Sequence, residues 1–116
     1  MLIHKVAQTV GLTIPTIRYY EREGLLDGRH VTRQSNGYRI YTVDAVGRLR
    51  HFKQARVAGL TISEIRQLSE AYDAGKLTDV KRCDFLQNKI DSLSQKIVLL
   101  QKMRAGFEAE LTTIQR

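Results

Sequence analysis

The side chains that could do chemistry in this 116-residue sequence are mainly arginines, tyrosines and threonines within its first 41 residues. Arg18, Tyr19 and Arg22 are spaced so that a helix would present them together on one side. Guanidinium groups bind phosphates and the edges of guanine, and hydroxyl groups bind both phosphates and bases. This combination is typical of a DNA-binding surface.

Catalytic groups, in contrast, follow no recognisable pattern. The sequence has no glycine-rich phosphate loop, no nucleophile paired with a base and no evident pair of carboxylates in a cleft. Its single cysteine, Cys83, and its histidines at positions 4, 30 and 51 do not have the spacing of a metal motif. An iron–sulfur cluster would need several cysteines. We therefore expect that the protein is not an enzyme, and the sequence identifies no resident cofactor with certainty.

The charge of the chain is consistent with a nucleic-acid partner. The net charge is +7, and residues 1–70 contain 11 Lys or Arg against six Asp or Glu. A basic half attracts polyanions, although a solvated basic surface explains the charge alone equally well. No apolar run approaches the ~18 residues of a membrane span, the first dozen residues do not resemble a signal peptide, and a lone cysteine favours a reducing compartment. We expect a cytoplasmic protein with no membrane partner.

Two short helices are predicted to position the first group of arginines. Ala7, Gly11 and Ile17 have the spacing of a helix-turn-helix, in which a small residue lies at the crossing and glycine in the turn. Thr13 is expected to cap the second helix, which ends near Arg22. That helix would turn outward Thr13, Ile14, Arg18, Tyr19 and Arg22.

Residues 31–41 are predicted to form a β-hairpin, with a type I′ turn at Asn36-Gly37. Such a wing could lie along the DNA backbone. Tyr38 could contact DNA or pack in the core, and we favour DNA; for Tyr41 we favour the core. The arginines of this hairpin are Arg29, Arg33 and Arg39. A third helix capped by Thr42 follows, and then a fourth helix with a capping box at Thr61 and Glu64.

The last predicted helix, residues 84–114, has a heptad seam with one polar member, Arg104. It would be roughly 46 Å long at ~1.5 Å per residue, too long for a small domain at one end to cover. A second copy of the chain is the favoured partner, and folding back onto the N-terminal part is the alternative. The apolar dimerisation residues are Leu86, Ile90, Leu93, Ile97, Leu100, Phe107 and Leu111, followed by Ile114.

The predicted fold is therefore mainly α: a winged helix-turn-helix DNA-binding domain at residues 1–72, a connector at 73–83 and a coiled-coil dimerisation helix at 84–116. A coiled-coil interaction module with incidental basic charge is the competing functional class.

Three motifs occur in an order that resembles the MerR family of transcription factors. They are Thr16-Ile17-Arg18-Tyr19-Tyr20-Glu21, then Gly24-Leu25-Leu26, then Asn36-Gly37-Tyr38-Arg39-Ile40-Tyr41. The segments Phe52-Lys53-Gln54-Ala55-Arg56, Gly59-Leu60-Thr61 and Glu64-Ile65 are similar to the following helix pair of that family, and the final helix to its antiparallel dimerisation helix. The resemblance covers essentially the whole chain.

This resemblance implies a dimer that binds a pseudo-palindromic operator in double-stranded promoter DNA and distorts an over-long spacer. An effector would then allow RNA polymerase to engage, so that the protein acts as an activator. Sequence would be recognised partly through the deformability of the DNA. The residues expected at the DNA are Thr13, Ile14, Thr16, Arg18, Tyr19, Arg22, Arg33, Tyr38 and Arg39.

The effector is left open by the resemblance. Metal-sensing members place one cysteine at the start of the dimerisation helix, which Cys83 matches, and more in a later loop, which this sequence lacks. Members that sense aldehydes carry a cysteine in the third helix, where this chain has Val57 and Ala58. Three interpretations of Cys83 therefore stay open. In the first, which we favour, Cys83 is a small, semi-buried residue at the start of a helix. In the second, it is a reactive thiol activated by the helix dipole, and in the third, it is a metal ligand whose site is completed by residues from outside this chain.

Overall fold

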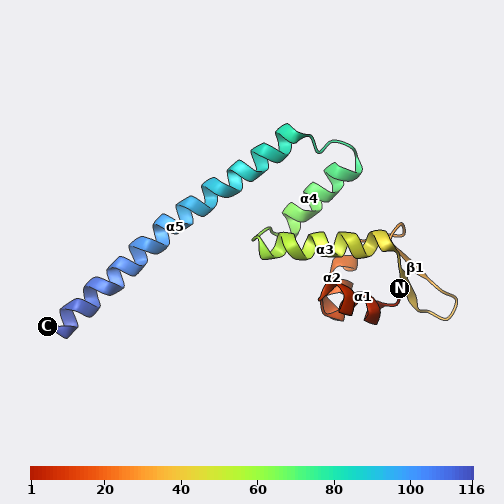
Figure 1. Ribbon diagram of the computed structural model, residues 1–116, viewed down its shortest axis with the longest axis horizontal. Coiled ribbons are helices and arrows are strands. Elements are labelled where there is room, and N and C mark those ends of the chain that lie inside the picture. Colours follow the sequence, from red (N-terminus) through yellow and green to blue (C-terminus); the bar gives the residue numbers. More distant parts are fainter. The chain divides into compact units, whose positions relative to one another are not determined.

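Four helices and a two-stranded hairpin form the first part of the chain, and one long helix forms the second, in the computed structural model, which describes residues 1–116 (Figure 1). The two parts are compact units of residues 1–74 and 75–116. Their assignment to DNA binding and to dimerisation stays a prediction.

The first two helices are α1 (Ile3–Val10) and α2 (Ile14–Arg22), joined by a short turn. Gly11 ends α1 with φ +71°, a left-handed conformation that a side chain would disfavour. Thr13 caps α2 through its hydroxyl, and Pro15 lies in the first turn, where its missing N–H removes no helical hydrogen bond. The predicted pair of helices is confirmed.

The hairpin consists of β1 (Val31–Arg33) and β2 (Arg39–Tyr41), which pair antiparallel. The predicted type I′ turn is wrong. The last paired residues are Arg33 and Arg39, and beyond them the N–H of Gln34 donates to the carbonyl of Tyr38 at 2.8 Å, so that residues 35–37 form the tip of the loop. Only Gly37 in the loop has a positive φ. The Gly37 N–H donates to the carbonyl of Gln34 at 2.9 Å. In this longer loop Asn36 is not required to adopt a positive φ, as it would be in a two-residue type I′ turn.

Helices α3 (Val43–Val57) and α4 (Ile62–Asp73) complete the first unit. The hydroxyl of Thr42 accepts a hydrogen bond from the backbone of α3, as predicted. Thr61 and Glu64 form both hydrogen bonds of the predicted capping box, at 3.1 and 2.9 Å. The starts of both helices are therefore confirmed.

A single core joins these elements. Tyr20 of α2 and Phe52 of α3 pack edge to face, with ring centroids 5.8 Å apart. Tyr41 is buried, as predicted, and His30 is a buried polar residue. The buried apolar residues are Val6, Val10, Ile17, Tyr20, Leu25, Leu26, Tyr41, Ala45, Val46, Leu49, Phe52 and Ile65.

The long helix, α5 (Asp79–Gln115), begins five residues before the predicted start at residue 84. The predicted connector over 73–83 is therefore too long. Thr78 caps the helix by accepting from the N–H of Lys81 at 3.2 Å, and Asp79 complements the positive end of the helix dipole. At ~1.5 Å per residue the helix is about 55 Å long.

The predicted seam of α5 is exposed along its whole length. The helix buries no residue, and the apolar seam side chains are 51–73% exposed: Leu86, Ile90, Leu93, Ile97, Leu100, Phe107, Leu111 and Ile114. None of the helices combines the length and the apolar character that crossing a membrane requires.

Candidate nucleic-acid interface

Helix α2 presents a cationic face, because its apolar side chains occupy the opposite one. Ile17 and Tyr20 are buried in the core. Arg18 and Arg22 are exposed, and Tyr19 is 39% exposed. These three side chains lie where the sequence predicts them, and they have the chemistry to reach phosphates or base edges.

At the N-terminal end of α2, the threonine hydroxyls already have hydrogen-bond partners within the protein. The Thr13 hydroxyl accepts from the N–H of Thr16 at 3.3 Å, and the two hydroxyls lie 2.8 Å apart. Ile14 and Thr16 are half-buried. The threonine hydroxyls therefore first hold the start of the helix, and a DNA contact would share them with this role.

On the hairpin, Arg33 and Tyr38 are exposed, with Tyr38 at 62%. The N–H of Tyr38 donates to the side-chain oxygen of Asn36 at 3.1 Å, which fixes the loop next to the ring. Core packing, the alternative considered for Tyr38, is therefore excluded in this chain. Arg39 is more sheltered, with 31% of its side chain exposed.

A hollow of about 180 Å³ is lined by residues of both the hairpin and α2. Its polar lining comes from three elements: Arg18 of α2, Tyr38 and Arg39 of the hairpin, and His4 of α1. Sequence reasoning did not select His4. The only available signal was its position in the first turn of α1, which says nothing of its distance from the hairpin.

Glu21 is the residue of this region that sequence reasoning missed as a functional candidate. Its side chain is 16% exposed, and it forms an ion pair with Arg39 at 3.4 Å. Its second oxygen accepts a hydrogen bond from the Tyr41 hydroxyl. Burial and the adjacent Glu21 raise the pKa of Tyr41, so the phenol stays protonated and donates.

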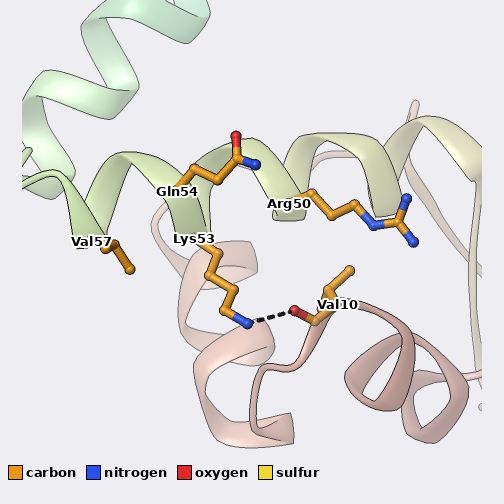
Figure 2. A pocket seen from close by; sticks show the side chains of 5 residues that line it. All are labelled: Val10, Arg50, Lys53, Gln54 and Val57. Carbon is orange, nitrogen blue, oxygen red and sulfur yellow. Dashed lines mark hydrogen bonds between the residues drawn. The ribbon is translucent and has the colours of Figure 1, made fainter.

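A second hollow, of about 370 Å³, lies between the end of α1 and the C-terminal half of α3 (Figure 2). Val10 and Val57 give it apolar walls, and Arg50, Lys53 and Gln54 give it a polar rim. The Lys53 ammonium donates to the carbonyl of Val10 at 3.1 Å, as the dashed line in Figure 2 shows. Lys53 therefore ties α3 to the last turn of α1.

Arg29 has a different place from the one predicted for it. It precedes β1, and its guanidinium binds the carboxylates of Asp27 at 2.8 Å and Asp73 at 3.2 Å. The hydrogen bonds from Arg29 hold the pKa of Asp27 well below its ordinary value. Arg29 is thus engaged within the protein rather than free on a wing. Arg48 of α3 also binds Asp73, at 2.5 Å.

His30 is buried at the base of the hairpin. Its Nε2 lies 3.2 Å from a carboxylate oxygen of Asp44, and its Nδ1 accepts from the N–H of Asp27 at 3.2 Å. Both ring nitrogens therefore have partners, which is the condition for burying an imidazole without a large cost.

Cys83 is neither at the start of α5 nor semi-buried, and that part of the prediction is wrong. The helix begins at Asp79, so Cys83 lies in its second turn, and the residue is exposed. The effect of the helix dipole fades within the first turn, which removes the main reason to expect an activated thiol. No group of three or more His, Cys, Asp or Glu side chains is placed to hold a metal ion.

Comparison with known proteins agrees with this geometry. The family described as "MerR HTH family regulatory protein" matches residues 1–72, and the one described as "MerR, DNA binding" matches residues 46–109. The regulator HmrR of Rhizobium leguminosarum is 33% identical over 108 residues, covering 93% of this chain and 81% of its own. The mercuric resistance operon regulatory protein of Bacillus cereus is 34% identical over 101 residues, covering 87% and 75%.

Among solved structures, the transcription regulator PbrR691 of Ralstonia metallidurans, in complex with lead(II), has a TM-score of 0.73 and 27% identity. The match covers 100% of this chain and 86% of that one. The fold prediction of a winged helix-turn-helix followed by a long helix is confirmed.

Proposed function

The chain belongs to the MerR family of DNA-binding transcriptional regulators, and on that premise we propose that it binds a pseudo-palindromic promoter operator as a homodimer. The observation that carries the proposal is the shared hollow of α2 and the hairpin. Arg18, Tyr38 and Arg39 line it together, although Arg18 and Tyr38 are 20 positions apart in the sequence. A recognition helix and a wing that meet in this way can span a groove and the adjoining backbone.

We propose that the two arginines have different tasks at the operator. Arg39 neutralises a phosphate, so that Arg39→Ala should weaken binding to all sequences alike and flatten the slope of log affinity against log salt by about one unit. Arg18 reaches base edges, so that Arg18→Ala should cost ~1–3 kcal/mol and relax specificity at one position.

The test is the affinity of each variant for operator and scrambled duplexes across a range of salt concentrations. Arg82→Ala on α5 is the matched control, because it removes the same charge from an exposed position outside the proposed interface. Wild-type affinity in both Arg18→Ala and Arg39→Ala would refute the proposed docking.

Dimerisation through α5 supplies the twofold symmetry that such an operator has. The support is the exposed heptad seam of α5, which runs from Leu86 to Ile114 and is about 42 Å long at ~1.5 Å per residue. An exposed apolar strip of this length is typical of an interaction surface. We propose that residues 84–116 pair antiparallel with a second copy, and that residues 1–72 contact the DNA.

The regulatory step we propose is distortion of the promoter spacer, which realigns the two elements that RNA polymerase recognises. Two relatives favour a metal as the effector: the name of one refers to mercuric resistance, and the structure of another contains lead(II). The donors of this chain do not form a metal site by themselves. Cys83 is the one position in the sequence where a thiol-reactive compound or a thiophilic metal completed by outside donors could act.

A further inference from the structure

We infer that Glu21 is a positioning residue for DNA binding, which holds the Arg39 guanidinium in the orientation that a phosphate requires. The inference rests on the proposed function of Arg39 as a phosphate ligand. Glu21 lies on α2, and its carboxylate contacts Arg39 and Tyr41 of the hairpin.

The Glu21 carboxylate divides its two oxygens between two residues of β2. One oxygen accepts from the Tyr41 hydroxyl, and the other lies 3.4 Å from Nε of Arg39. Arg39 and Tyr41 are two positions apart on the strand, so their side chains lie on the same face. A single carboxylate from α2 therefore bridges the hairpin at two points.

The anchor of this bridge is rigid. Tyr41 is 2% exposed, and its ring cannot move without disturbing the core. Its hydroxyl fixes the Glu21 carboxylate, and the carboxylate in turn fixes the stem end of the Arg39 guanidinium. The buried Tyr41 therefore holds Glu21, and Glu21 holds the more exposed Arg39.

The ion pair with Glu21 leaves N–H donors of the Arg39 guanidinium available for a further partner. A guanidinium has five N–H donors, and Nε is the nitrogen of Arg39 that lies nearest to Glu21, at 3.4 Å. Arg39 pairs with no side chain of the chain other than Glu21, and it lines the hollow shared with Arg18. An arginine held in this way can bind a phosphate through its terminal nitrogens without first losing side-chain freedom.

The test uses the full chain and a duplex selected from random-sequence DNA by the wild-type protein, with a scrambled duplex for comparison. Ordering one flexible side chain corresponds to roughly two- to tenfold in affinity. We expect Glu21→Gln, which keeps an acceptor for Tyr41 but loses the charge, to weaken operator binding by that factor. Glu21→Asp, which keeps the charge but is too short to bridge both partners, should do the same.

The decisive measurement uses the double variant Glu21→Gln, Arg39→Ala. If Glu21 acts through Arg39, Glu21→Gln should have no further effect in an Arg39→Ala background. Glu23→Gln is the matched control, because it removes the same charge next to α2 from a residue that pairs with Arg66 instead of the hairpin. Thermal unfolding of each variant checks that the fold is retained.

Equal weakening by Glu21→Gln in both backgrounds would overturn the inference, as would wild-type affinity of both single Glu21 variants. The proposed function fails in a different way, when the wild type does not distinguish the selected from the scrambled duplex and Arg39→Ala binds like the wild type. The two failures are therefore separable in one set of measurements.

Discussion

Replacing Gly11 by alanine tests how the turn of the helix-turn-helix is held. Gly11 has φ +71°, and a left-handed conformation costs a residue with a Cβ about 1–2 kcal/mol. A Cβ at this position would also lie 2.6 Å from the Lys53 ammonium. The lysine tip is flexible and can move away, but it then loses its 3.1 Å hydrogen bond to the carbonyl of Val10.

The loss of the hydrogen bond between Lys53 and Val10 determines how much more Gly11→Ala should destabilise the fold than a glycine replacement without this contact. A hydrogen bond from a charged, half-buried donor contributes about 1–2 kcal/mol. Gly24→Ala is the matched control, because Gly24 has φ +77° and its added Cβ would meet nothing within 4 Å. Gly11→Ala should therefore be less stable than Gly24→Ala by about 1–2 kcal/mol, or roughly 4–8 °C in Tm for each kcal/mol in a domain of this size.

The assay is thermal and urea unfolding at one fixed protomer concentration, since association shifts Tm. In a Lys53→Met background the Val10 contact is already absent, so the two glycine variants should lose stability equally. Equal losses in the background that retains Lys53 would refute the reasoning, because they would show that the contact between α3 and the turn contributes nothing.

Three further predictions concern other parts of the chain. Replacing Leu93 and Leu100 together with glutamate should give monomers that bind the operator poorly, and a monomeric wild type at micromolar concentration in sedimentation would contradict this. Hydrogen bonds from Arg48 lower the pKa of Asp73 in the folded protein. The Arg48–Asp73 pair therefore stabilises the fold above the ordinary carboxyl pKa, and this stabilisation is lost as the pH falls below that value. Asp73→Asn should accordingly flatten the decline of the unfolding free energy between about pH 5 and pH 3. Cys83→Ser should leave dimerisation and operator binding intact because the thiol is exposed, whereas a promoter response to thiophilic metals that vanishes in this variant would identify Cys83 as the sensing residue.

The helices of the first unit were predictable because their starts depend on local chemistry. Thr13, Thr42 and Thr61 each accept a hydrogen bond from a backbone N–H three residues later, and that pattern is visible in the sequence. The start of α5 was missed although Thr78 caps it in the same manner. Polar composition over 73–83 indicated a connector, and composition does not distinguish a connector from the first turn of an exposed helix.

The partners of the polar side chains were beyond sequence reasoning. Glu21 and Tyr41 are 20 positions apart, and Arg29 and Asp73 are 44 positions apart. Nothing in the spacing of such residues indicates that they meet, because the meeting depends on how α2, the hairpin and α4 pack. For this reason the sequence predicted the arginines of the proposed interface but not the carboxylate that pairs with one of them.

The double engagement of Asp73 has a mechanical consequence. Its carboxylate, at the last residue of α4, is shared by Arg48 of α3 and by Arg29 at the base of the hairpin. A torque applied to the end of α4 must either break two ion pairs or pull the hairpin base with it. The path from the end of α4 to the hairpin base therefore runs through two ion pairs. Added salt should weaken the Arg29–Asp73 pair, in which 61% of the arginine side chain is exposed, more than the Arg48–Asp73 pair, in which 16% is exposed.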